Sequence, residues 1–197
     1  MNARIVAGLM LSATLGCISV IGGCTAAQAQ LFRDTDLSAG PFQRLFGIRP
    51  SPIARTLVNF PAPYRPGSIV IDTSERRLYL VTAPGQALRY GIGVGRFGFT
   101  WAGTRTVSMK REWPDWTPPS QMLRRRPDLP RHMVGGIENP LGARAIYLGS
   151  SLYRIHGSNE PETIGQAVSS GCFRMTNEDV IDLYDRVRVG AKVVVLR

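Results

Sequence analysis

The chain has 197 residues, among them two histidines and three cysteines, and a formal net charge of +10. This length favours one domain with an appendage over two full domains. The charge favours a partner rich in carboxylates or other anions, although an arginine-rich genomic bias would produce the same surplus. The basic residues are scattered and form no base-reading motif, which argues against a nucleic-acid-binding protein.

The first thirty residues differ from the rest of the chain. Arg4 is followed by an uncharged apolar run from Ile5 to Ile21 and by a small-x-small pattern at 27–29. This pattern predicts a secretory signal peptide over residues 1–29 and is too short and too rich in glycine for a membrane span. Two alternatives remain, namely an uncleaved signal anchor and a lipoprotein signal in which lipidated Cys24 tethers the protein to a membrane. All three predict an exported protein of the periplasm or cell envelope.

Residues 30–66 are rich in proline and show no sustained alternation of apolar and polar residues. They predict a linker with a short helical turn near Gln43–Phe46. From Gly67 onward the pattern becomes that of a β protein. Three strands joined by short turns are predicted as an antiparallel meander, over Ser68–Thr73, Leu78–Thr82 and Ala87–Val94.

Residues 95–140 are rich in glycine, proline, tryptophan and arginine and show little periodicity. Their three tryptophans argue against disorder, so we predict a folded excursion that forms one wall of a binding cleft. His132 lies in this excursion and is assigned to the surface or to that wall. The stretch GVGRFG at 93–98 matches the dinucleotide-binding fingerprint, but the residues after it predict no helix. Without a helix N-terminus to hold the pyrophosphate, we exclude this function.

The last third of the chain predicts two strands, one helix and a final buried strand. The two strands are Ala145–Leu148 and Tyr153–Ile155. The helix begins with a capping box of Thr176 and Asp179, continues with an apolar stripe and is predicted to end at Gly190; the stripe consists of Val180, Leu183, Tyr184 and Val187. The segment KVVVL closes the chain. Together the elements predict a predominantly β member of the α+β class over residues 67–197.

Cys172 is the one cysteine outside the expected leader, and His156 lies sixteen residues before it. An unpaired cysteine in an exported protein indicates a reactive thiol, with a packed inert thiol as the alternative. His156 ends a predicted strand and Cys172 precedes the predicted helix, so the intervening chain can bring the imidazole to the thiol as its base. The alternatives are a structural histidine and a metal site, for which two ligands are weak support.

The glycines beside this pair fit the catalytic interpretation. Gly157 allows a backbone carbonyl to approach the ring of His156 and orient it. Gly171 permits the tight turn that presents the sulfur of Cys172, and the backbone N–H groups around Gly171 and Cys172 are natural donors to an oxyanion.

The segments that contain these residues resemble one known family. His156-Gly157, SSGCFRM at 169–175, NEDVIDLYDRV at 177–187 and GGIENPLGARAIYL at 135–148 are similar to the signature of the L,D-transpeptidase catalytic domain (YkuD) family. The resemblance implies that Cys172 is the nucleophile, His156 its acid and base, and Gly157 the orienting carbonyl. It places Arg174 at the mouth of the site, where the alternative is a surface salt bridge. The family's usual second histidine is replaced by Ser170, which can still donate a hydrogen bond to a substrate.

The resemblance also implies a reaction. Cys172 would form an acyl-thioester with the tetrapeptide stem of peptidoglycan and pass the acyl group to an amine. That amine would belong to a second stem, a free D-amino acid or an envelope lipoprotein. No metal and no organic cofactor is implied. Two alternatives stay open: hydrolysis at the same site, which is L,D-carboxypeptidase activity, and a non-catalytic peptidoglycan-binding protein.

Overall fold

The computed structural model describes residues 49–61 and 63–197. The predicted leader, the Cys24 tether and the predicted turn near Gln43–Phe46 lie outside these residues. The described strands are β1 (Thr56–Asn59), β2 (Ile69–Asp72), β3 (Arg77–Ala83), β4 (Gln86–Gly91), β5 (Val94–Gly95), β6 (Gly103–Glu112), β7 (Arg144–Leu148), β8 (Arg154–His156), β9 (Ala167–Ser169), β10 (Phe173–Arg174) and β11 (Lys192–Leu196). The helices are α3 (Ser120–Arg125), the 3₁₀ turn η2 (Pro161–Thr163) and α4 (Asn177–Arg186).

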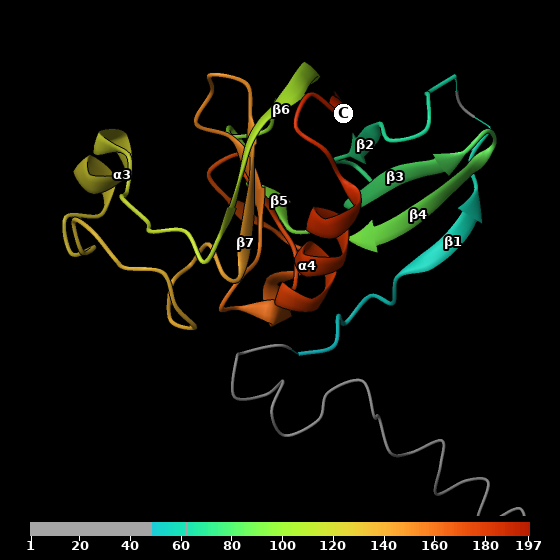
Figure 1. Cartoon of the computed structure of the whole chain (residues 1–197). Helices are drawn as coiled ribbons and strands as arrows, with labels where there is room; N and C mark the ends of the chain where they lie inside the picture. Colours follow the sequence, from blue (N-terminus) through green and yellow to red (C-terminus); the bar gives the residue numbers. More distant parts are fainter. Residues whose placement is uncertain (1–48, 62) are drawn as a thin grey trace, which may run out of the picture. The chain divides into compact units, whose positions relative to one another are not determined.

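Nine strands form one sheet in the order β1-β4-β3-β2-β11-β6-β7-β8-β10, and β5 pairs with β9 in a second, two-stranded sheet. Most neighbours are antiparallel, whereas β2 with β11, β8 with β10 and β5 with β9 are parallel. Figure 1 shows α4 between the β6–β7 part of the sheet and the β2–β4 part. The predicted class, α+β with a predominance of β structure, is confirmed.

The predicted meander is confirmed as β2, β3 and β4, which pair antiparallel in chain order. The expected third strand, Ala87–Val94, is two strands rather than one. β4 ends at Gly91, and Val94 begins β5, which pairs with β9 instead of β3. The chain therefore leaves the meander at Ile92-Gly93 and joins the segment that leads to Cys172.

Two strands lie where the sequence predicts none. β1 falls within the residues predicted as a linker and pairs with the outer edge of β4. β6 falls within the predicted excursion, and it joins β11 to β7. Nine of its ten residues are exposed or half-buried and one, Val107, is buried, so the strand lacks the alternation that identifies a strand in a sequence.

No helix follows the GVGRFG stretch. β5 leads through a turn at Gly98, which has φ of +81°, directly into β6. The exclusion of a dinucleotide fingerprint therefore agrees with the local structure, because the motif needs a helix N-terminus at this point.

The hydrophobic core contains residues from both parts of the sheet and from α4. Ile69, Ile71, Leu78, Ile146 and Phe173 are each at most 1% exposed. The apolar stripe of α4 supplies Val180, Leu183 and Val187 to the same core. α4 thus occupies the inside of the sheet and fixes the position of the segment immediately before it, which includes Cys172.

The start of α4 is as predicted. The Oγ1 of Thr176 accepts a hydrogen bond of 3.2 Å from the backbone N–H of Asp179, which caps the helix.

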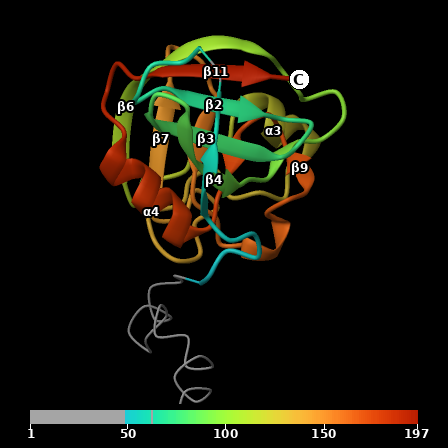
Figure 2. The same cartoon turned by 90° about the vertical axis from the view of Figure 1, so that its right-hand side faces the viewer.

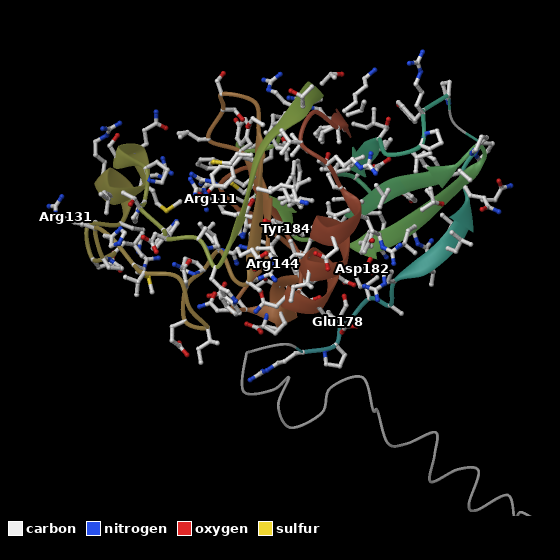
Figure 3. The ribbon with its side chains drawn as sticks, viewed as in Figure 1. Arg111, Arg131, Arg144, Glu178, Asp182 and Tyr184 are labelled. Atoms are coloured by element: carbon white, nitrogen blue, oxygen red, sulfur yellow. The ribbon has the colours of Figure 1, made fainter. Side chains whose placement is uncertain are left out.

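The predicted end of α4 is wrong by one turn, since the helix ends at Arg186 rather than near Gly190. Lys110 of β6 caps it instead, donating from Nζ to the carbonyls of Tyr184 (2.5 Å) and Val187 (2.7 Å). The same Nζ lies 4.0 Å from the centroid of the Tyr184 ring. Arg144 approaches that ring at 5.3 Å, and Figure 3 shows the two side by side. A cation from a neighbouring strand therefore satisfies the helix carbonyls.

The final strand occupies a central place in the sheet. β11 lies between β2 and β6, and Figure 2 shows it beside β2. Val193 and Val195 point into the core and are at most 2% exposed, which confirms the predicted buried strand. Among the described residues, no helix has the length and apolar character that crossing a membrane requires.

Candidate active site

His156 ends β8, and Cys172 immediately precedes β10, the parallel neighbour of β8. In the β8–β10 pair, Phe173 is opposite Ile155 and Arg174 is opposite His156. Ile155 and Phe173 point into the core. Because side chains alternate along a strand, the residues next to them face away from the core, so Cys172 lies on the same face as His156.

His156 is 5% exposed, and its Nδ1 lies 2.6 Å from the carbonyl oxygen of Gly157. A carbonyl can only accept, so Nδ1 carries the proton and Nε2 keeps its lone pair. Burial lowers the pKa of His156 to about 3, and the positive charges of Arg174 and Arg154 act in the same direction. The resting imidazole is therefore neutral, oriented by a backbone oxygen, and able to accept a proton at Nε2.

Cys172 is a free, half-buried cysteine. Its thiol lies 3.7 Å from the carbonyl oxygen of Leu152. Burial raises the pKa of Cys172, and the backbone N–H and guanidinium of Arg154 oppose that rise. The resting sulfur is thus a neutral thiol that needs a base at the moment of attack, rather than a preformed thiolate.

The turn before Cys172 is fixed by Ser169. The Ser169 Oγ donates to the carbonyl oxygen of Cys172 at 2.6 Å and accepts from the N–H of Gly171 at 3.1 Å. Gly171 has φ of +110°, and a Cβ there would lie 2.6 Å from the Tyr153 ring. The turn therefore requires glycine, and the N–H of Gly171 is engaged within the turn instead of facing an incoming substrate.

The stacked rings of Trp101 and Tyr153 pack against the same turn. Trp101 donates from Nε1 to the carbonyl oxygen of Gly171 at 2.9 Å. Its ring stacks on Tyr153 with centroids 4.5 Å apart and planes inclined by 13°. Of the three tryptophans predicted to form a cleft wall, Trp101 is the one in contact with the cysteine turn.

Asn177 connects the orienting glycine to α4. Its Oδ1 accepts a hydrogen bond of 2.8 Å from the N–H of Ala143, and a Cβ on Gly157 would lie 2.3 Å from this oxygen. The Gly157 backbone thus passes close to the first residue of α4. Glycine is needed here because any side chain would displace the carbonyl that orients His156.

Arg174 forms an ion pair across the rim of the site. Its Nη1 lies 2.7 Å from Oε2 of Glu160, which is half exposed, and 3.5 Å from Oγ1 of Thr163. The Arg174 side chain is 21% exposed and close enough to His156 to lower the pKa of the imidazole. Arg174 thus forms a salt bridge and also acts electrostatically on His156 and Cys172, so both interpretations of it remain open. Ser170 is half-buried in the turn next to Cys172.

Some residues of the site were not predicted. Arg154 lies two positions before His156 on the same strand, so the two-residue period of a strand would have placed it on this face. Ser169 and Asn177 act through contacts between distant segments, for which the sequence holds no local signal. His132 lies outside the site, 3.3 Å from Thr117 and 3.7 Å from Asp115, and is half exposed.

Other candidate features lie elsewhere in the molecule. Within the part of the chain that the structure describes, no three or more His, Cys, Asp or Glu residues are grouped as metal ligands. A hollow of about 310 Å³ is lined by Phe60, Tyr79 and Arg89 on the outer face of the meander, remote from the catalytic pair.

Comparison with known proteins places this site in a family. Residues 66–195 match the L,D-transpeptidase catalytic domain (YkuD) family. The "Probable L,D-transpeptidase ErfK/SrfK" of Escherichia coli K12 is 38% identical over 137 residues, which cover 65% of this chain and 43% of that protein. "Probable L,D-transpeptidase YcfS" of the same strain is 37% identical with the same coverage. The chain thus spans less than half the length of these relatives.

Solved structures share the fold. A protein titled "Probable carnitine operon oxidoreductase caia from Brucella melitensis" is 48% identical, with a TM-score of 0.51, and the match covers 77% of this chain and 98% of that one. An "L,D-transpeptidase from Mycobacterium smegmatis" is 22% identical with a TM-score of 0.52, over 66% of this chain and 58% of that one. The second similarity concerns the fold alone.

Proposed function

Because the chain belongs to the L,D-transpeptidase catalytic domain (YkuD) family, we propose that it is a peptidoglycan L,D-transpeptidase with Cys172 as its nucleophile. The observation that carries the proposal is the pair of strands β8 and β10. Their register and the alternation of side chains support a neutral, carbonyl-oriented imidazole on the same face as a half-buried thiol. This is the arrangement of base, orienting group and nucleophile that acyl transfer requires.

The first half-reaction forms a thioester. Nε2 of His156 takes the proton of the Cys172 thiol as the sulfur attacks the carbonyl carbon of the L,D peptide bond in a tetrapeptide stem. The C–N bond then breaks, and the imidazolium returns the proton to the departing D-alanine nitrogen. The carbonyl oxygen of Gly157 keeps the proton on Nδ1. Nε2 is therefore the nitrogen that takes the thiol proton and later returns it to the leaving amine.

The developing oxyanion needs donors near the sulfur. The N–H of Gly171 is held by Ser169, so we assign the principal backbone donor to Cys172 itself. Gly171 would contribute only if its bond to Ser169 opened on substrate binding. Ser170 and Arg174 flank the turn and are assigned to substrate contacts at the rim.

The second half-reaction transfers the acyl group to an amine. The acceptor amine attacks the thioester carbon, His156 takes the amine proton, and the proton returns to the sulfur as the C–S bond breaks. The acceptor classes are a second stem peptide, a free D-amino acid and the lysine of an envelope lipoprotein. These residues complete the proton cycle, so the mechanism calls for no metal or organic cofactor. We place the protein in the periplasm or cell envelope, where peptidoglycan lies.

The test is covalent labelling of the thiol. The purified protein is incubated with a carbapenem and weighed intact, beside the Cys172→Ala and His156→Gln variants. We expect one adduct on the wild type, none on Cys172→Ala, and slow formation on His156→Gln, because its thiol has lost its base. A folded wild-type protein that gains no mass would refute the proposal and favour a non-catalytic peptidoglycan-binding protein.

Muropeptide products then identify the acceptor. Crosslinked dimers formed from purified tetrapeptide stems indicate transfer to a second stem, and exchange of the terminal residue indicates a free D-amino acid. Free tripeptides indicate hydrolysis, which would replace transferase activity by L,D-carboxypeptidase activity at the same cysteine.

A further inference from the structure

The turn at residues 96–99 packs directly against the turn that presents Cys172. The N–H of Phe99 donates to the carbonyl of Arg96 at 2.9 Å, and the N–H of Arg96 donates to the carbonyl of Ser169 at 3.0 Å. A Cβ on Gly171 would lie 3.2 Å from the carbonyl oxygen of Phe99. A ligand that contacts the surface of this turn therefore lies beside the nucleophile.

Two guanidinium groups lie on the ring of Phe99. The Cζ of Arg96 is 4.4 Å from the ring centroid, and the Cζ of Arg125, which comes from α3, is 5.1 Å from it. Both arginines are exposed. The ring holds each flat side chain by a cation–π contact and so reduces the freedom of a group that is otherwise long and mobile.

The two charges have no anionic partner. Neither Arg96 nor Arg125 forms an ion pair within residues 49–61 and 63–197, whereas Arg126, the next residue along, pairs with Asp128. Two like charges on one ring repel each other, and an anion between or beside them would remove that repulsion. The planar fork of a guanidinium matches a carboxylate in a bidentate manner.

We propose that Arg96 and Arg125, held by Phe99, form a carboxylate-binding subsite of the Cys172 site. This inference rests on the proposed function, because it identifies the ligand as the peptide stem of peptidoglycan and the bound group as one of its free carboxylates. The subsite selects acidic stems by charge and fixes the stem along the wall that also contains Trp101. Amidation of the stem carboxylates removes the recognised group.

Binding to the Cys172→Ala variant tests the subsite without any catalytic turnover. Calorimetry measures the Kd of an acidic tetrapeptide stem for this variant and for the same protein with Arg96→Ala and Arg125→Ala added. We expect the Kd to rise by at least about tenfold, as loss of charge-assisted hydrogen bonds implies. The same peptide with its carboxylates amidated is expected to bind both proteins equally and weakly.

The matched control removes two other arginine charges, from α3 and the loop that follows it. Arg124 and Arg131 are exposed and lie on α3 and on the loop after it, where Figure 3 shows Arg131 at the outer end. The Arg124→Ala, Arg131→Ala protein is expected to keep the parent Kd within about twofold, because these side chains do not contact Phe99. A loss equal to that of the Arg96, Arg125 variant would replace the subsite by a general effect of net charge.

Three results would overturn the subsite: equal binding of the acidic stem with and without Arg96 and Arg125, equal binding of acidic and amidated stems by the parent, or no binding at all. A carbapenem adduct on the wild type separates these failures from failure of the proposed function. If the adduct forms and the Kd values do not differ, the proposed function is retained and the subsite is refuted. If no adduct forms but the Kd values differ as expected, the subsite belongs to a binding protein.

Discussion

The protonation of His156 at rest determines how Cys172 is activated. Burial lowers the pKa of the imidazole to about 3 and raises that of the thiol, so neither group is charged near neutral pH. An ion pair of thiolate and imidazolium is thus not the resting state. The pair is formed only when a substrate carbonyl is there to receive the sulfur.

This state predicts a flat pH profile for acylation. The base is lost only when His156 is protonated, which happens far below pH 6.5 because its pKa is lowered. The second-order rate constant for carbapenem acylation is expected to vary less than about twofold from pH 5 to 8. Stopped-flow or timed mass measurements on the wild type provide the test. A rate constant that falls to half near pH 6.5 would instead show an imidazole of ordinary pKa and would contradict the assigned resting state.

The same shift affects folding. An unfolded histidine binds a proton near pH 6.5 and folded His156 does not until about pH 3, so the unfolded chain holds the extra proton between these values. The contribution of His156 to stability is therefore complete above pH 6.5 and is lost as the pH falls toward 3.

Sequence reasoning is reliable for residues whose role is set by the local chain. His156 and Cys172 were noticed because the chain has two histidines and three cysteines, and Gly157 was noticed because it stands beside His156. Ser169 and Asn177 were missed because their hydrogen bonds join segments that only the fold brings together. Gly171 was noticed for its backbone freedom, but the partner of its N–H was not predictable from the sequence.

At the level of elements, prediction succeeded where apolar and polar residues alternate or a cap is encoded. The meander and the start of α4 carry such signals, as described for Thr176. β6 is exposed over most of its length and carries none. The end of α4 was misplaced because Lys110, a residue more than seventy positions earlier, caps the helix in place of Gly190.

The Lys110 cap can be measured by substitution. Lys110→Met keeps the aliphatic length of the side chain but leaves two helix carbonyls without their donor and removes the cation from the Tyr184 ring. We expect the free energy of unfolding to fall by about 2–4 kcal/mol, since each hydrogen bond to a charged group is worth about 1.5–3 kcal/mol and the two share one Nζ. Urea unfolding at pH 7 measures the change.

Arg111→Met is the control for Lys110→Met, because Arg111, labelled in Figure 3, is the next residue of β6 and is exposed. Its effect is expected to stay within about 0.5 kcal/mol. Equal losses in the two variants would mean that charge on β6, and not the cap, stabilises α4.

For the whole molecule, residues 53–55, just before β1, pack against the folded domain. Arg55 lies 3.4 Å from Asp179 and 3.5 Å from Asp182, so it connects the start of the described chain to α4. Ile53 fits against Gly91, where an added Cβ would lie 2.6 Å from the Cβ of Ile53. This docking was not predicted, because the proline-rich composition of the region indicates a linker and its contacts are with residues more than thirty positions away.

Loss of Arg55 is expected to destabilise the protein more at pH 7.5 than at pH 4.5. Burial raises the pKa of Asp179 to about 6, and Ser51 and Arg55 limit that rise. The carboxyl of Asp179 binds its proton more tightly in the folded than in the unfolded chain. The free energy of unfolding therefore falls as the pH rises from 3.8 to about 6. Arg55→Met raises this pKa further, so this loss of stability grows above pH 6.

The Arg55 prediction is measured by thermal unfolding at the two pH values. Arg49→Met, in an exposed residue of the same segment, is the control and is expected to leave the melting temperature unchanged at both. A loss for Arg55→Met that is equal at pH 4.5 and 7.5 would show that Arg55 acts by packing alone, without coupling to the charge of Asp179.

β11 joins the two parts of the large sheet. β11 is hydrogen-bonded to β2 on one side and to β6 on the other, so until residues 192–196 leave the biosynthetic machinery the meander and the strands around the thiol share no direct pairing in the large sheet. A nascent or C-terminally clipped chain is consequently an open sheet with two unsatisfied edges. Docking of β11 is therefore the step that unites the two edges, and until it occurs the meander and the strands around Cys172 remain separate sheets.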